Sequence, residues 1–196
     1  MHIKREVQAV MQALETAGFA AYAVGGAVRD SLLGKEPFDW DVTTAALPQQ
    51  VMTLFGDNAI PTGLKHGTLT VLMDEYPLEI TTFRLDGEYL DNRHPKEVIF
   101  TRKLENDLSR RDFTVNAIAL SWQGEIMDPF MGQADLQAGL LRAGGDAEQR
   151  FEEDALRILR GLRFASVLDF TVEQETAAAM REKKELLRQI AAERGL

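Results

Sequence analysis

Two aspartates near the N-terminus have the type and spacing that metal-assisted phosphate chemistry needs. Asp39 and Asp41 are two residues apart, and in an extended strand, whose side chains alternate in direction, both would project from one face. Two neighbouring carboxylates repel each other unless a cation lies between them. Mg²⁺ binds one or two protein carboxylates and completes its coordination shell with water and phosphate oxygens. The pair therefore predicts a Mg²⁺ site.

A glycine pair shortly before these aspartates could bind the phosphate groups. Gly25 and Gly26 follow an apolar run, residues 20–24, that is typical of a buried strand, and precede a short helical segment that ends at Gly34. Backbone N–H groups of glycine can approach an anion closely, and a helix N-terminus favours negative charge. Alone, a glycine pair is usually only a turn, and Asp-x-Asp is often a solvated loop edge. In this order, on a strand-turn-helix-strand frame, they indicate a site for nucleotide phosphates.

Two later stretches supply arginines. Residues 110–117 read Arg-Arg-Asp-Phe-Thr-Val-Asn-Ala and place two guanidinium groups and a carboxylate at one end of a predicted helix. Arginine binds phosphate in a bidentate manner, although exposed ion pairs at a helix end contribute little to stability. Residues 153–163 alternate acidic and basic side chains, which is usual for a solvated helix face. A carboxylate, which accepts hydrogen bonds, and a guanidinium, which donates them, could at that spacing instead bind the Watson–Crick edge of a base.

The elements around these residues are mixed α and β to about residue 145 and helical beyond it. Runs of β-branched residues predict an antiparallel hairpin from strands 67–72 and 78–84, with Glu79 either facing solvent or adding a third carboxylate near the aspartates. Apolar spacing predicts helices over 3–17, 48–55, 104–116, from 151 onward and over 172–194, and a short hairpin over 118–128.

Composition sets broad limits on function. The 196 residues carry a net charge of −9, which argues against a surface that coats nucleic acid in general but allows a basic cleft. The chain has no cysteine, which excludes disulfides and thiolate metal sites. Without a signal-peptide core or an apolar run long enough to span a membrane, we expect a cytoplasmic protein that does not bind membranes. The sequence does not define an oligomeric state.

The order of the motifs resembles that of the class II tRNA nucleotidyltransferases, the CCA-adding enzymes. The motifs are Gly-Gly-x-Val-Arg-Asp at 25–30, Asp-x-Asp at 39–41, Arg-Arg-Asp-Phe-Thr-x-Asn-Ala at 110–117 and Glu-Asp-x-x-Arg at 153–157. The resemblance runs from about residue 22 to 163. It implies an α+β fold, in which a polymerase beta-like nucleotidyltransferase head (1–145), with a mixed, largely antiparallel sheet and flanking helices, precedes an all-helical neck (146–196). We expect that neck to be truncated, without the body and tail domains.

The resemblance also implies roles for individual residues. Asp39 and Asp41 would bind two catalytic Mg²⁺ ions, and Glu79 is a candidate third carboxylate. The expected nucleotide-binding residues are Gly26, Arg29, Arg111, Asp154, Arg157, Arg160 and Arg163. Asp154 and Arg157 would pair with CTP or ATP in place of a nucleic-acid template. The expected flexible loop, which helps to change specificity from C to A, includes Asp86, Gly87, Tyr89 and Arg93.

The implied reaction is attack by a tRNA 3′-hydroxyl on the α-phosphate of CTP or ATP, with release of pyrophosphate. The loop that begins at Asp86 argues against an enzyme that adds only CC, and residues 65–71 resemble CCA-adding enzymes more than poly(A) polymerases. An A-adding enzyme and a bacterial poly(A) polymerase remain alternatives, as does a non-catalytic RNA-binding protein. Because body and tail would be missing, we expect nucleotide binding to be better preserved than tRNA binding.

Overall fold

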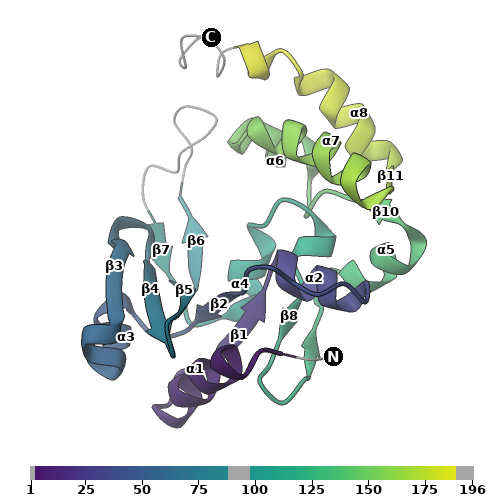
Figure 1. Cartoon of the computed structure of the whole chain (residues 1–196). Helices are drawn as coiled ribbons and strands as arrows, with labels where there is room; N and C mark the ends of the chain where they lie inside the picture. The colour runs from purple at the N-terminus through teal and green to yellow at the C-terminus, as the bar shows by residue number, and fades with distance from the viewer. Residues whose placement is uncertain (1–2, 88–97, 189–196) are drawn as a thin grey trace.

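The computed structural model describes residues 3–87 and 98–188 (Figure 1). The helices are α1 (Arg5–Thr16), α2 (Gly26–Leu32), α3 (Pro48–Phe55), α4 (Leu104–Ser109), α5 (Gly132–Ala138), α6 (Ala147–Glu153), α7 (Leu156–Leu168) and α8 (Gln174–Lys183). The strands are β1 (Ala21–Val24), β2 (Asp41–Thr44), β3 (Ala59–Gly63), β4 (Thr68–Met73), β5 (Tyr76–Thr82), β6 (Arg84–Asp86), β7 (Val98–Phe100), β8 (Ala119–Leu120), β9 (Ile126–Met127), β10 (Leu140–Leu141) and β11 (Thr171–Val172).

A seven-stranded sheet forms the centre of the first part of the chain, in the order β3-β4-β5-β2-β1-β8-β9. Its pairs are antiparallel except β2 with β5, which are parallel. The sheet is therefore mixed and largely antiparallel, and helices flank it, as expected from the family resemblance. The predicted hairpin is confirmed as β4 and β5, whose turn residues Asp74 and Glu75 both have positive φ.

The core lies between this sheet and the helices that pack on it. The buried side of α1 consists of the four residues whose helical spacing the sequence shows: Val7, Val10, Met11 and Leu14. They join buried strand residues such as Val42 and Ile80 in one cluster. Burying each such side chain stabilises the fold by about 1.5–3 kcal/mol. Because this cluster fixes β1, β2 and β5 together, it also fixes the strand ends that carry the predicted site residues.

The helical part follows the sheet in the sequence and lies at the opposite end of the molecule from α1 and α3 (Figure 1). α6 packs against both α7 and α8. The short parallel pair of β10 and β11 connects residues on both sides of position 145. The domain boundary expected at 145 stays a prediction. Within residues 3–87 and 98–188, no helix combines the length and the apolar character needed to cross a membrane.

Three predicted helices differ from the observed ones by more than their end residues. The helix expected over 104–116 ends at Ser109, because the chain turns there and Phe113 pairs in a β-bridge with Ala143. The helix expected from Phe151 onward is interrupted at Asp154, which has extended backbone angles. The helix expected over 172–194 begins at Gln174, and its regular part ends at Lys183. Residues 189–194 of that prediction lie outside the described residues.

Candidate active site

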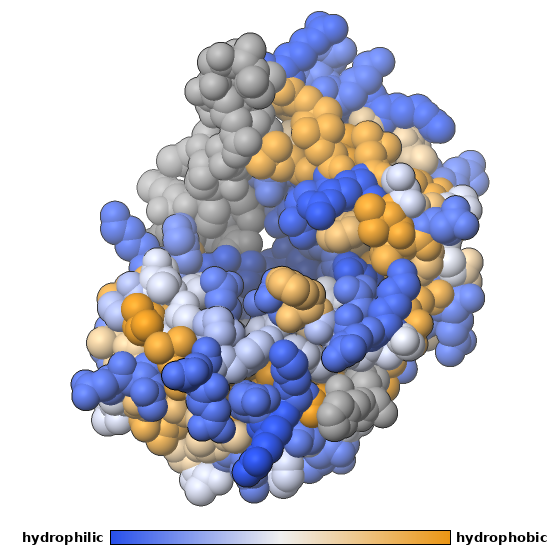
Figure 2. All heavy atoms as spheres, in the orientation of Figure 1, coloured by the Kyte–Doolittle hydropathy of each residue, from blue (hydrophilic) through white to orange (hydrophobic). Residues whose placement is uncertain are grey.

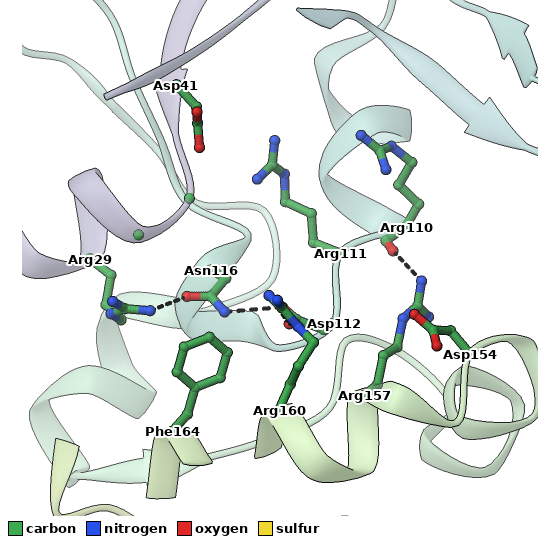
Figure 3. Close-up of a pocket in the computed structure, with 12 residues that line it drawn as sticks. Arg29, Asp41, Arg110, Arg111, Asp112, Asn116, Asp154, Arg157, Arg160 and Phe164 are labelled. Carbon is green, nitrogen blue, oxygen red and sulfur yellow. Dashed lines mark hydrogen bonds and ion pairs between the residues drawn. The ribbon is translucent and has the colours of Figure 1, made fainter. Parts of the chain in front are cut away.

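A cavity of about 370 Å³ lies between the end of the sheet and α7. Figure 2 shows that the face in view is hollowed between the sheet-bearing part and the helices, with hydrophilic side chains around the hollow. Six of the expected nucleotide-binding residues line this cavity, together with the expected metal ligand Asp41: Gly26, Arg29, Arg111, Asp154, Arg157 and Arg160. The structure thus brings together three segments that are far apart in the sequence, within residues 25–41, 110–116 and 154–164 (Figure 3).

Carboxylates gather at the edge of the cavity that the strands form. Asp41 begins β2, and its Cα is paired with that of Glu79 on the parallel strand β5. Asp39 lies two residues before β2 rather than within it, and its side chain is exposed, as is that of Glu79. Neither Asp39 nor Glu79 is among the residues that line the cavity. Asp41 therefore faces the cavity, with two further carboxylates beside it.

The surroundings of Asp41 raise its pKa. Loss of water around the carboxylate is the largest cause, followed by the negative charges of Glu79 and Asp39, while Arg111 acts in the opposite direction. The side chain also remains partly open to solvent. A carboxylate whose pKa is raised by neighbouring negative charge is one that a bound cation would stabilise.

The donor set is compatible with Mg²⁺ bound by two carboxylates. Mg²⁺ takes oxygen ligands and commonly uses one or two protein carboxylates together with water and phosphate oxygens. Among residues 3–87 and 98–188, no group of three or more acidic, His or Cys side chains is close enough to hold one ion. Asp39 and Asp41 stay the candidate ligands, and Glu79 as a third carboxylate stays a prediction.

The glycine turn brings backbone and an arginine close together. Gly25 has φ +72°, which favours glycine, and a Cβ at this position would lie 3.2 Å from Nη1 of Arg111 and 3.9 Å from Oδ2 of Asp41. Burial lowers the pKa of Arg111, against the opposing effects of Asp107 and Asp41, but a guanidinium stays charged in proteins. Its Nε is buried without a hydrogen-bond partner among the described residues. This arginine has donor capacity left for an anionic ligand.

A line of hydrogen bonds connects the two sides of the cavity (Figure 3). Arg29 donates to Oδ1 of Asn116 at 2.7 Å, and Asn116 donates to Oδ1 of Asp112 at 3.0 Å. Arg160 on α7 donates to Oδ2 of Asp112 at 2.8 Å. The guanidinium carbons of Arg29 and Arg160 lie 5.1 Å and 5.3 Å from the ring centre of Phe164. These contacts hold α7 against the strand-turn-helix segment.

Arg157 and Asp154 lie together at the start of α7. Arg157 is buried and donates to the carbonyls of Arg150 and Arg110, at 3.3 Å and 3.1 Å, and to Glu153 at 3.1 Å. Asp154 accepts a hydrogen bond from the backbone N–H of Leu156 at 3.0 Å, which places its carboxylate at the first turn of α7. Both side chains border the cavity (Figure 3), so a donor and an acceptor are available on one wall.

Other predicted residues lie outside the cavity. Arg163 is on α7 but is exposed and does not line the cavity. Asp86 is the last residue of β6, and Gly87, which follows it, is not among the residues that line the cavity. Tyr89 and Arg93 of the expected flexible loop lie outside the described residues.

Sequence reasoning did not assign four residues that line the cavity: Arg110, Asp112, Asn116 and Phe164. Three of them belong to the Arg-Arg-Asp-Phe-Thr-x-Asn-Ala motif, of which only Arg111 was expected to bind nucleotide. A sequence signal for Asp112 and Asn116 exists, because these two polar residues, four apart, and Thr114 between them alternate with apolar Phe113 and Val115. Phe164 follows the arginines of α7 with core-like spacing, and no sequence feature distinguishes it from a core residue.

A mixed sheet with a glycine turn, a carboxylate-bearing edge and a cluster of arginines around one cavity defines a nucleotidyltransferase head joined to helices. The family model described as the poly A polymerase head domain matches residues 21–142, more than half of the chain. The chain therefore belongs to this family.

Relatives of the chain are CCA-adding enzymes. It is 50% identical over 185 residues to the CCA-adding enzyme of Lactobacillus helveticus (strain DPC 4571), covering 94% of this chain and 46% of the relative. The crystal structure of the Bacillus stearothermophilus CCA-adding enzyme in complex with CTP superposes with a TM-score of 0.82 at 40% identity, over 94% of this chain and 49% of that one.

A tRNA nucleotidyltransferase complexed with a primer tRNA and an incoming ATP analogue is also similar. Its TM-score is 0.71 at 32% identity, over 90% of this chain and 50% of that one. The chain spans about half the length of the curated relatives it matches.

Proposed function

We propose that the chain carries the catalytic and nucleotide-selecting part of a tRNA nucleotidyltransferase that adds CCA to the 3′ end of tRNA from CTP and ATP. The observation that carries this proposal is the single cavity that joins Asp41, Arg111 and the Asp154/Arg157 pair. A carboxylate, a phosphate-binding arginine and a base-sized set of hydrogen-bonding groups are the three parts that nucleotidyl transfer requires. Because tRNA is the substrate, we infer a cytoplasmic reaction.

The metal in this proposal is Mg²⁺, with Asp41 and Asp39 as its protein ligands. When bound, Mg²⁺ would favour ionisation of the attacking hydroxyl and neutralise charge on the pyrophosphate leaving group. The raised pKa of Asp41 supports the assignment, because burial is its largest cause and the negative charges of Glu79 and Asp39 add to it, with Arg111 acting in the opposite direction. Glu79, one strand away, would add to the negative potential that attracts the ion.

The chain's own residues would position the reactants. The backbone at Gly25 and Gly26, together with Arg29 and Arg111, would hold the triphosphate so that the 3′-hydroxyl of tRNA attacks the α-phosphate in line. Pyrophosphate would leave on the side of the arginines. Such positioning, combined with fixed charges, accounts for most of the catalysis in phosphoryl transfer. No covalent enzyme intermediate is needed.

The base would be selected by Asp154 as acceptor and Arg157 as donor. Cytosine and adenine both present an exocyclic amine as donor and a ring nitrogen as acceptor on their Watson–Crick edges, so one acceptor and one donor can recognise both. Uracil and guanine present a carbonyl where cytosine and adenine present the amine. Discrimination against UTP and GTP therefore follows from these two side chains.

Incorporation and binding assays test this function. The chain, with Mg²⁺ and a tRNA ending at the discriminator base, is given CTP, ATP or both, and the products are resolved to single nucleotides. We expect C, C and A in that order, and binding of CTP and ATP at least about tenfold tighter than that of UTP and GTP, which corresponds to about 1.4 kcal/mol. Equal binding of all four nucleotides would contradict selection by Asp154 and Arg157.

Poly(A) synthesis is the second candidate, because the family model that matches the chain is that of the poly A polymerase head domain. The same assay separates the two functions. Long A-tails on RNA that is unrelated to tRNA would favour poly(A) synthesis. Addition of a single A to tRNA that already ends in CC, without any use of CTP, would instead indicate an A-adding enzyme.

A further inference from the structure

Asp107 is a fully buried carboxylate on α4 that accepts four hydrogen bonds from described residues. Its Oδ1 accepts from Nε of Arg110 at 3.1 Å and from the backbone N–H of Arg84 at 3.3 Å. Its Oδ2 accepts from Oγ1 of Thr43 at 3.1 Å and from Nη2 of Arg111 at 3.4 Å. An ionised carboxylate has about four acceptor positions, so this one is saturated.

The four donors come from separate parts of the site. Arg110 and Arg111 line the cavity and follow α4 directly. Thr43 lies on β2, two residues after Asp41. Arg84 is the first residue of β6. Asp107 therefore joins the two arginines of the cavity to the strand that begins with the candidate metal ligand.

The bonds constrain side chains that would otherwise have many conformations. An arginine side chain has about 2 kcal/mol of rotamer entropy, and a fixed carboxylate partner removes much of that freedom before a ligand arrives. Burial alone would raise the pKa of Asp107, but the charges of Arg110 and Arg111 outweigh burial and hold the pKa below its ordinary value. The carboxylate is therefore ionised at neutral pH and binds both guanidinium groups by charge-assisted hydrogen bonds.

We propose that Asp107 is a positioning residue, which holds Arg110 and Arg111 in place relative to β2 so that they meet the nucleotide triphosphate beside Asp41. The inference rests on the proposed function and assigns Asp107 no contact with substrate. It has a specific consequence. Affinity for the β- and γ-phosphates depends on Asp107, whereas affinity for the nucleoside part of the same ligand does not.

The test compares CTP with CMP. Asp107→Asn keeps the shape of the side chain but replaces one acceptor oxygen by an amide N–H₂, which would face two donors, and removes the charge that the arginines require. Equilibrium dissociation constants for CTP and CMP are measured by calorimetry in the presence of Mg²⁺ on the whole 196-residue chain. We expect the constant for CTP to rise about tenfold or more and that for CMP to change by less than about twofold.

Asp135→Asn is the matched control. Asp135 is also buried and ion-paired, with Thr114 as a 2.6 Å donor and Arg142 as a 3.2 Å donor, but it does not line the cavity. Its variant should lose stability without changing the ratio of CTP to CMP affinity. An equal change of that ratio in both variants would show a general effect of losing a buried carboxylate, and would overturn the proposal.

A second variant covers the case in which Asp107→Asn does not fold. Thr43→Val leaves the carboxylate and both arginine contacts intact. It removes the bond from Asp107 to β2, together with a 3.2 Å bond from the Thr43 hydroxyl to the carbonyl of Thr81 on β5. We expect a rise of about threefold in the dissociation constant for CTP, with that for CMP unchanged. Wild-type affinity for CTP in Thr43→Val, or in a folded Asp107→Asn, would overturn the inference. If the wild-type chain bound no CTP, the proposed function itself would fail.

Discussion

The two walls of the cavity differ in whether their carboxylates are paired with arginines. The strand wall is the segment 25–41, which lines the cavity through Gly25, Gly26, Arg29 and Asp41, together with Glu79 on the strand beside Asp41. Asp30 in this segment pairs with Arg29, but the carboxylates of Asp39, Asp41 and Glu79 make no hydrogen bond or ion pair with a side chain in residues 3–87 and 98–188. On the helix wall, formed by residues 107–116 and 150–160, the carboxylates accept bonds from arginines: Asp107 from Arg110 and Arg111, Asp112 from Arg160, and Glu153 from Arg150 and Arg157.

Because of this difference, the charges of the two walls are arranged differently before a ligand binds. The helix wall is compensated internally, so its arginines are held in defined positions before a nucleotide arrives. On the strand wall, burial of Asp41 and the negative charges of Glu79 and Asp39 raise the pKa of Asp41, which disfavours the folded state until a cation is present. We infer that removing a charge from the strand wall costs activity but not stability, whereas removing one from the helix wall costs both.

The largest effect is expected at Asp41. Asp41→Asn removes a candidate metal ligand and should lower nucleotide incorporation by roughly a thousandfold or more, equal to about 4 kcal/mol in the activation free energy. The same variant should be at least as stable as the wild type, because it relieves repulsion with Glu79 and Asp39. Incorporation assays and thermal unfolding measure the two quantities.

Mg²⁺ provides the control for this prediction. A ligand at a hundred times its dissociation constant stabilises a protein by about 2.7 kcal/mol, so Mg²⁺ should raise the melting temperature of the wild type more than that of Asp41→Asn. Asp74→Asn, at the exposed β4–β5 turn, is the matched variant and should behave as the wild type. Unchanged turnover in Asp41→Asn would refute the metal assignment.

Arg157 tests the helix wall. Arg157→Ala would leave two carbonyl groups, those of Arg110 and Arg150, and the carboxylate of Glu153 without this donor. We expect a loss of about 2–4 kcal/mol in the free energy of unfolding, measured with denaturant, because buried acceptors lose a charged partner. Discrimination of CTP from UTP should fall as well.

Arg157→Lys keeps the positive charge and separates charge from geometry. Lysine lacks the planar fork that reaches both a carbonyl of the preceding segment and Glu153. It should therefore recover part of the stability but little of the discrimination between CTP and UTP. Full recovery of discrimination by lysine would contradict a geometric role for the guanidinium.

The sequence predicted the residues of the strand wall better than those of the helix wall. The reason is the separation in the sequence between the residues that form each wall. Asp41 follows the glycine turn by 15 residues, within one strand-turn-helix-strand unit, so local pattern and spacing suffice. The resemblance to a known family was needed to connect this unit with Asp154 and Arg157. Even then, the role of Asp107 was missed, because its bonds to Thr43 and Arg84 span 64 and 23 residues.

The secondary structure was likewise predictable only where residues close in the sequence determine it. The β4–β5 hairpin was predictable because β-branched residues and a short turn encode it locally. The end of α4 at Ser109 was not, since apolar residues continue at helical spacing through Phe113. The tertiary pairing of Phe113 with Ala143 overrides that spacing.

The pH dependence of stability should have opposite signs on the two walls. The pKa of Asp107 is lowered in the folded state, so its stabilising contribution is present above its unfolded pKa of about 3.9 and is lost as the pH falls through the folded value. The pKa of Asp41 is raised, so its destabilising contribution is absent below about 3.9 and appears as the pH rises through the folded value.

Melting temperatures between about pH 3 and pH 7 test both signs. Relative to the wild type, Asp41→Asn should gain stability as the pH rises, whereas Asp107→Asn should lose it. The two difference curves should converge in acid, where both carboxyl groups are protonated in the folded and the unfolded states. Curves of the same sign would contradict the contrast between the walls.

The smallest effect on stability and on CTP binding is expected for substitution of Arg163. This prediction tests where the helix wall ends along α7. Arg163 is exposed, lies outside the cavity lining, and has no hydrogen bond or ion pair within residues 3–87 and 98–188. Arg163→Ala should change the free energy of unfolding by less than about 0.5 kcal/mol and the dissociation constant for CTP by less than about twofold.

Arg160 is the matched position on the same helix, three residues earlier. Its guanidinium pairs with Asp112 at 2.8 Å and borders the cavity, so Arg160→Ala should weaken CTP binding by about fivefold, or about 1 kcal/mol. The family resemblance assigned both arginines to the nucleotide site, whereas the cavity includes only Arg160. Equal losses of CTP affinity in the two variants would mean that Arg163 reaches the nucleotide when it binds, and the helix wall would then extend one turn further along α7.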